Sequence, residues 1–152
     1  MSIVHAFIDG AYLRGMGKER QPAVRYPDPL IIATNAIGVS NIRLDSSSLR
    51  RLTYFDALPD LPSHEVESHD VRTRDAANLE AYCRHIELMN DCQLGFGVLR
   101  RGYRKNREQK GVDTLMAVEM LVGAFNRVFD WAILVAGDAD FVPVSSRRLS
   151  VA

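Results

Sequence analysis

The chain has 152 residues, of which 47% are hydrophobic and 25% are charged, a composition that excludes disorder throughout. This length fits one domain, and we expect residues 1–152 to form it. Lys and Arg number 19 and so do Asp and Glu, which excludes a uniformly basic coat for nucleic acid but not a local basic patch.

The cysteines and the apolar segments indicate a cytoplasmic protein. Cys83 and Cys92 suit small buried side chains in a reducing compartment better than a disulfide framework. No run of eighteen apolar residues predicts a membrane span, and the N-terminus lacks the charged and apolar regions of a signal peptide. We therefore expect no membrane partner.

Predicted strands and helices alternate along the chain. The strands are expected at 3–9, 49–57, 92–99 and 131–136, the clearest helices at 73–89 and 112–125, and a short helix at 10–18. Another helix is expected to begin at Asp28, which can cap it ahead of Pro29, and to end at Gly38. The alternation predicts an α/β fold with a mainly parallel sheet, in which ligands lie beyond the carboxyl ends of the strands.

Carboxylates follow several of the predicted strands. Asp9 ends the first strand, and Asp138 and Asp140 follow the last one. Asp113 lies in the first turn of the helix at 112–125. A parallel sheet brings these acids to one edge, where their repulsion calls for a divalent cation. Mg²⁺ or Mn²⁺ takes oxygen ligands and leaves water sites for a phosphate, so we expect one or two such ions and phosphodiester hydrolysis.

Each acid also has an ordinary structural interpretation. An Asp-Gly pair after a strand is a common turn, Asp113 suits the positive end of a helix dipole, and residues 137–140 suit a glycine turn with a helix cap. Their coincidence at one predicted edge favours the metal site. Glu119 is either a peripheral acid of that site or a solvated side chain, and Asp56 fits a strand-end cap better than a ligand.

A basic segment precedes Asp113 and contains one opposing acid, Glu108. Its residues that suit nucleic-acid contact are Arg100, Arg101, Tyr103, Arg104, Lys105, Arg107 and Lys110. Most charge runs are merely solvated, but cations beside an acidic metal site, with an aromatic ring for base stacking, are what a phosphate backbone requires. We predict that this segment binds nucleic acid, with Arg14, Lys18 and Arg20 adding to the same rim.

Four segments together resemble the NYN domain, in the LabA-like group of the PIN-like nucleases. They are FIDGAYLR at 7–14, TYFDALP at 53–59, LRRGYRKNREQKGVDTLMAVEML at 99–121 and WAILVAGDADFVPV at 131–144. The resemblance implies a single domain built as a Rossmann-like, PIN-like three-layer sandwich. It also implies a metal-dependent ribonuclease that acts on RNA, single-stranded in preference. By matching position, the catalytic and metal-binding residues would be Asp9, Asp113, Asp138 and Asp140.

The chain departs from the family's pattern at three places. Glu119 and Tyr12 stand where many relatives have Asp and Asn. Relatives usually continue after the GDxDF motif with a full helix and another strand, of which residues 141–152 show little sign. We expect this C-terminal strand to be missing and the strand at 131–136 to form an edge, covered by a second subunit or by the short tail.

Two functions therefore stand open. One is a metal-dependent endoribonuclease, and the other is a catalytically weak or inactive RNA-binding or regulatory module of the same fold. A phosphatase with an aspartate nucleophile is set aside, because Ala11 stands where a second acid is required two residues after Asp9. Dinucleotide binding lacks its glycine motif, and the histidines and cysteines lack the spacing of a zinc site.

Overall fold

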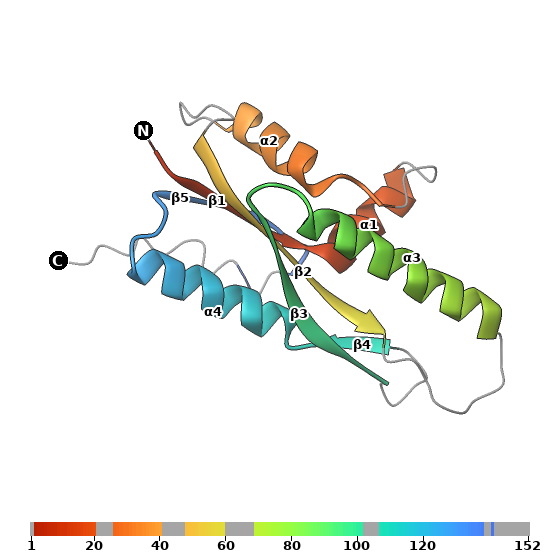
Figure 1. Cartoon of the computed structure of the whole chain (residues 1–152). Coiled ribbons are helices and arrows are strands. Elements are labelled where there is room, and N and C mark those ends of the chain that lie inside the picture. Colours follow the sequence, from red (N-terminus) through yellow and green to blue (C-terminus); the bar gives the residue numbers. More distant parts are fainter. Residues whose placement is uncertain are drawn as a thin grey trace.

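The computed structural model describes residues 2–20, 26–40, 48–59, 69–101, 107–138 and 141. Strands and helices alternate along these residues, as the sequence predicts (Figure 1). In chain order the elements are β1 (Val4–Asp9), α1 (Gly10–Arg20), α2 (Pro29–Val39), β2 (Leu49–Pro59), α3 (His69–Glu87), β3 (Cys92–Arg101), β4 (Arg107–Lys110), α4 (Val112–Phe125) and β5 (Trp131–Val135). The bounds of α4 coincide with those of the predicted helix.

The start of α2 follows from its capping residues. The Asp28 carboxylate accepts hydrogen bonds from the backbone N–H groups of Leu30 (2.8 Å) and Ile31 (3.3 Å), and Pro29 is the first helical residue. The predicted stop at Gly38 is one residue early, because Ser40 caps the helix instead and donates its backbone N–H to the Ile37 carbonyl.

The sheet is mainly parallel and has the strand order β4-β3-β2-β1-β5. β3, β2, β1 and β5 run parallel, and β4 runs antiparallel to β3. The chain leaves β1 for β2 on one side and later returns to β5 on the other side. β1 and β5 therefore flank the point where the strand order reverses, which is where ligands bind in open α/β sheets.

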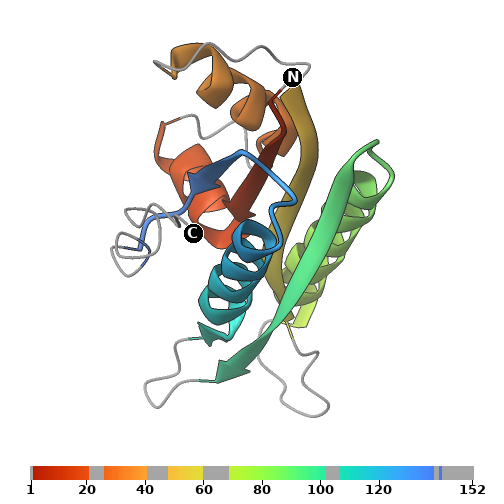
Figure 2. The ribbon, with the colours of Figure 1, turned by 90° about the vertical axis from the view of Figure 1, so that its left-hand side faces the viewer.

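The sheet lies between two layers of helices (Figures 1 and 2). The helices α1, α2 and α3 cover one face, and α4 covers the other. This separation follows from the handedness rule, because right-handed crossovers that progress in opposite directions along a sheet lie on opposite faces. The arrangement is the predicted three-layer α/β sandwich.

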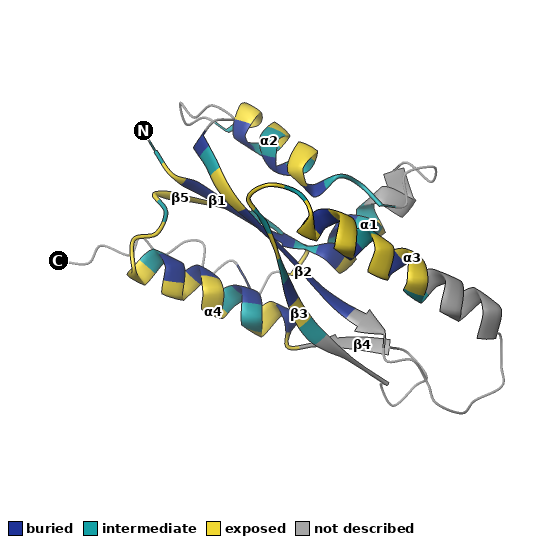
Figure 3. Cartoon of the chain, viewed as in Figure 1, coloured by how far each residue is buried: buried dark blue, intermediate teal, exposed yellow. Residues whose placement is uncertain are grey.

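Alternate side chains of the strands fill two hydrophobic cores, and burial is concentrated in the middle of the molecule (Figure 3). Ile8 of β1 and Tyr54 of β2 face α1 and α3. Phe7 and Phe55, their neighbours along the chain, face Met116 of α4. Because side chains alternate with a period of two, this assignment also fixes the face on which polar residues of the same strands lie.

One edge of the described sheet is β5, which pairs with β1 alone among the described strands. The outer side of α4, the turn that follows it and the first residue of β5 expose large apolar side chains. We call this set the apolar stripe, and it comprises Val118, Leu121, Val122, Phe125, Val128 and Trp131. Among the described helices, none combines the length and the apolar character that crossing a membrane requires.

Candidate active site

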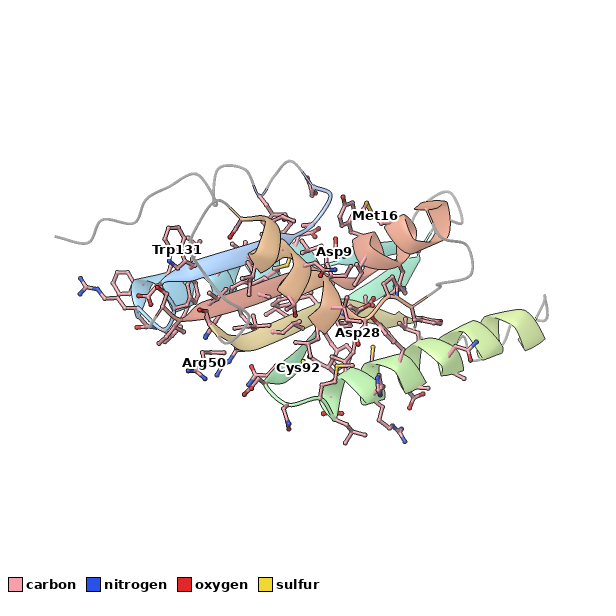
Figure 4. All side chains as sticks on the ribbon, turned by 90° about the horizontal axis from the view of Figure 1, so that it is seen from above. Asp9, Met16, Asp28, Arg50, Cys92 and Trp131 are labelled. Carbon is pink, nitrogen blue, oxygen red and sulfur yellow. The ribbon has the colours of Figure 1, made fainter. Side chains whose placement is uncertain are left out.

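Asp9 lies at the carboxyl end of β1 and caps the helix that follows. Its Oδ1 atom accepts hydrogen bonds from the backbone N–H groups of Ala11 (2.9 Å) and Tyr12 (3.2 Å). These two groups have no acceptor within α1, so the carboxylate satisfies them. Among the described residues, the hydrogen bonds to Asp9 use Oδ1 alone, which leaves Oδ2 available as a ligand. Figure 4 shows Asp9 near the start of α1, at the opposite end of the sheet from Trp131.

Asp113 in the first turn of α4 belongs to the same edge as Asp9. The pKa of Asp9 is raised above its ordinary value, first by burial and then by repulsion from the Asp113 carboxylate, while the Tyr12 hydrogen bond opposes the shift. Asp56 adds a smaller repulsion. The structure thus brings two of the four predicted acids, from distant parts of the chain, within electrostatic reach of each other.

Asp138 is exposed and follows β5, the parallel neighbour of β1. The register pairs Ile8 with Val135, so the two strands end side by side. The residue before Asp138 is Gly137, which lies against the Tyr12 ring. A Cβ atom at Gly137 would lie 2.5 Å from a ring carbon of Tyr12. This contact connects the loop of Asp138 to the first turn of α1. Asp140 lies outside the described residues.

The acids of this edge suit a hard divalent cation in the chemistry of their donors, because carboxylate oxygens are the ligands that Mg²⁺ and Mn²⁺ prefer. The repulsion between Asp9 and Asp113 is also what a cation would relieve. Within the described part of the chain, however, no three His, Cys, Asp or Glu side chains gather closely enough to hold a metal ion. The structure therefore shows two carboxylates within electrostatic reach of each other and places Gly137, the residue before Asp138, against Tyr12 in the first turn of α1.

Glu119 and Asp56 occupy different places from this pair. Glu119 is exposed on α4, six residues after Asp113, a separation of about 9 Å along the helix axis. Asp56 belongs to the opposite face of the sheet, because it alternates with Phe55 and shares the side of Tyr54. Asp56 lies within β2 and forms an ion pair with Arg14. It is therefore not the strand-end cap that the sequence predicted, and it is not a ligand of the acidic edge.

Sequence patterns did not reveal the contacts of Arg14 and Tyr12. Arg14 was expected to add free charge to the basic rim, but it is paired with Asp56 and largely enclosed. The ion pair joins residues 42 positions apart, and no spacing rule predicts such a contact. Strand alternation is the available signal, since Asp56 continues the inward-facing series of Leu52 and Tyr54. Lys18 and Arg20 have side chains outside the described part of the structure.

The basic segment forms a β-hairpin where the sequence predicted a connector. Arg100 and Arg101 complete β3, and β4 returns antiparallel beside them, so that Arg100 lies opposite Glu108 and Arg101 opposite Arg107. The polar residues of β4 show none of the apolar alternation that identifies a strand. Tyr103, Arg104 and Lys105 lie outside the described residues, as do the side chains of Arg100, Arg101, Arg107 and Lys110.

Neither cysteine is activated as a nucleophile, and His5 lies apart from the acidic edge. Burial raises the pKa of the Cys83 thiol to about 11 and also raises that of Cys92, so neither forms a thiolate readily. Burial, with a smaller contribution from Arg51, lowers the pKa of His5. His5 packs against the Phe129 ring, away from the acidic edge, at a distance of 5.1 Å between ring centroids.

Comparison with known proteins gives one match. The family model described as the NYN domain matches residues 49–148, well over half of the chain. The matched region contains Asp113, Asp138 and the basic hairpin but begins after β1, which carries Asp9. Neither the curated proteins nor the solved structures that were searched gave a match.

Proposed function

Because the chain belongs to the NYN domain family, we propose that it is a metal-dependent endoribonuclease that hydrolyses phosphodiester bonds of single-stranded RNA. NYN domains have the PIN-like fold and are generally nucleases. Within this chain the proposal rests on one observation, the approach of Asp9 and Asp113 at the carboxyl edge of the sheet. β1 pairs with two strands of the matched region, which supports one domain over residues 1–152.

Asp9, Asp113 and Asp138 would hold one or two Mg²⁺ or Mn²⁺ ions, together with Asp140. When bound, the ion supplies a more acidic water and neutralises charge on the phosphate. Asp9 keeps Oδ1 on the α1 cap and offers Oδ2 as a ligand. Asp113 completes the ligand set or orients the attacking water. The basic hairpin, with residues 100–110, holds the phosphate backbone of the RNA.

The decisive experiment is a cleavage assay on a labelled single-stranded RNA and on DNA of the same sequence. We expect Mn²⁺ or Mg²⁺ to support cleavage of the RNA and EDTA to abolish it. Asp138→Asn should fold normally, because Asp138 is exposed, and should lower kcat by about 100-fold or more. The control is Glu87→Gln, which alters an exposed acid at the end of α3.

Three outcomes separate the possibilities. Loss of cleavage in Asp138→Asn but not in Glu87→Gln supports the assignment of the acidic edge. Full activity in Asp138→Asn removes Asp138 from the site. RNA binding without cleavage under every metal condition identifies the chain as the RNA-binding or regulatory module of this fold and refutes the nuclease proposal.

The edge strand and the free cysteines support two further parts of the proposal. The side of β5 that pairs with no described strand, together with the apolar stripe, favours a homo-oligomer, because proteins usually cover such an edge and such a surface. Cys83 and Cys92 are both free, which suits a reducing compartment, and we propose the cytoplasm.

A further inference from the structure

A buried polar cluster joins α1 to β2 beside the acidic edge, and we call it the Arg14 cluster, after Arg14, Tyr54 and Asp56. Arg14 donates from Nη2 to Asp56 Oδ1 at 3.1 Å and from Nη1 to Asp56 Oδ2. Arg14 Nη1 also donates to the Tyr54 hydroxyl at 2.9 Å, and that hydroxyl donates to Asp56 Oδ2 at 3.0 Å. The backbone N–H of Ala57 donates to Asp56 Oδ1 at 2.8 Å. The two carboxylate oxygens thus receive four hydrogen bonds.

The side chains of the Arg14 cluster are much less exposed to solvent than those of an ordinary surface ion pair. The Asp56 side chain is 1% exposed and that of Arg14 is 22% exposed. Burial alone lowers the pKa of Arg14, but the hydrogen bond and charge of Asp56 raise it above the ordinary value, so the guanidinium stays charged. Buried ion pairs often stabilise a fold no more than apolar packing does, and in some proteins they instead fix a single geometry. The cluster therefore suits a role in fixing the position of α1 against β2.

Gly10 connects this cluster to Asp9. A Cβ atom at Gly10 would lie 2.5 Å from Asp56 Oδ2 and would also collide with the Tyr54 ring, so the backbone of Gly10 rests directly on the cluster. Arg14 is four residues further on, which places it on the same face of α1 as Gly10. One side of the first turn of α1 is thus held by the cluster, and its free N–H groups are held by the Asp9 carboxylate.

We propose that Arg14, fixed by Asp56 and Tyr54, is a positioning residue that holds the first turn of α1 so that Asp9 keeps Oδ1 on the cap and Oδ2 toward the acidic edge. Arg14 acts through Gly10 and the α1 backbone and does not contact the metal or the RNA. This role rests on the proposed function, because it assigns Arg14 to the ligand geometry of the same site.

The test uses Arg14→Lys, which keeps the charge but loses the two-pronged contact, and Tyr54→Phe, which removes only the hydroxyl. The matched control is Arg84→Lys, since Arg84 pairs with Glu80 at 3.2 Å while both side chains are more than half exposed. Mn²⁺ affinity is measured by calorimetry without RNA. We expect the affinity to fall by about 10-fold or more in Arg14→Lys, as for other residues that orient ligands, and to stay unchanged in Arg84→Lys.

A second readout needs no metal. The N–H groups of Ala11 and Tyr12 depend on the Asp9 cap, so their hydrogen exchange reports its geometry. In Arg14→Lys and Tyr54→Phe this exchange should accelerate by about fivefold, while the amides of Phe7 and Ile8 in β1 keep their wild-type rates. Uniform acceleration at all four amides, or none, overturns the positioning role.

The two readouts distinguish the proposals. If the wild-type chain binds no Mn²⁺ and cleaves no RNA, the proposed function fails, and the exchange rates still decide whether the Arg14 cluster holds the Asp9 cap. If the wild-type chain binds Mn²⁺ and Arg14→Lys binds it equally well with wild-type kcat, Arg14 has only a structural role and the inference fails alone.

Discussion

Asp9 and Asp113 repel each other across the junction between the end of β1 and the first turn of α4, and this repulsion contributes, after burial, to the raised pKa of Asp9. The two residues are 104 positions apart in the sequence. A fold that places like charges together loses stability for each ionised pair. Such pairs are typical of sites that bind a ligand, where the ligand relieves the repulsion. The first two predictions concern this relationship.

Asp9→Asn should stabilise the metal-free protein at neutral pH. Because the pKa of Asp9 is raised in the folded state, the stabilisation from protonated Asp9 is present below the unfolded pKa of about 3.9 and is lost as pH rises through the folded value. Asn keeps the helix cap and carries no charge. Thermal unfolding in EDTA should show a higher Tm for Asp9→Asn at pH 7, with the difference shrinking toward pH 4. A lower Tm at pH 7 would contradict the assignment of Asp9.

Mn²⁺ should stabilise the wild-type protein against heat and have little effect on Asp9→Asn or Asp113→Asn. A ligand present at 100 times its Kd stabilises the folded state by about 2.7 kcal/mol, which unfolding scans detect. Glu119→Gln tests the role of Glu119, which the structure places along α4 from Asp113. Loss of the Mn²⁺ effect in Glu119→Gln would make it a member of the site, and an unchanged effect would leave it a solvated side chain.

Replacing Arg100, Arg101 and Arg104 with Ala should weaken RNA binding and reduce its dependence on salt. Each phosphate contact on a single strand contributes about 0.7 to the slope of log K against log salt concentration. Fluorescence anisotropy in EDTA measures this slope without cleavage. Arg50→Ala is the control, because Arg50 lies away from Asp9 in the molecule (Figure 4). An equal loss of slope in both proteins would remove the hairpin from the RNA interface.

Phe125→Ser should reduce the mass of the protein in solution from an oligomer to a monomer. Phe125 belongs to the apolar stripe and is 70% exposed, so its replacement should change the packing inside one subunit little. Light scattering coupled to size-exclusion chromatography measures the mass. A monomeric wild-type protein would show that no second subunit covers the stripe or β5.

The sequence predicted the layers of the fold better than it predicted individual contacts. The helix at 112–125 was placed correctly because its apolar residues recur with helical spacing after a clear start. β4 was missed because Arg107, Glu108 and Lys110 show no apolar alternation. This strand is recognised only by its antiparallel pairing with β3. The rule for parallel strand ends applies to Asp9 at the end of β1, whereas Asp113 lies in the first turn of a helix that follows the antiparallel strand β4.

The contacts of the Arg14 cluster could not be predicted from local sequence patterns. Asp56 looked like a cap because its sequence neighbours suggest a turn, whereas the fold extends β2 to Pro59 and encloses the carboxylate. Its partner, Arg14, belongs to a helix whose docking angle no local pattern specifies. Long-range polar pairs of this kind become visible only when the register of the strands and the face of the helix are both known.

The pairing of β1 with β5 also sets when the acidic edge can form during synthesis of the chain. β1 is made first, but its second neighbour in the sheet is the last described strand, and Asp138 follows that strand. The ribosome must therefore release β5 and Asp138 before the acids of the proposed site can come together. Translation of the segments between β1 and β5 thus separates the synthesis of Asp9 from the assembly of the acidic edge.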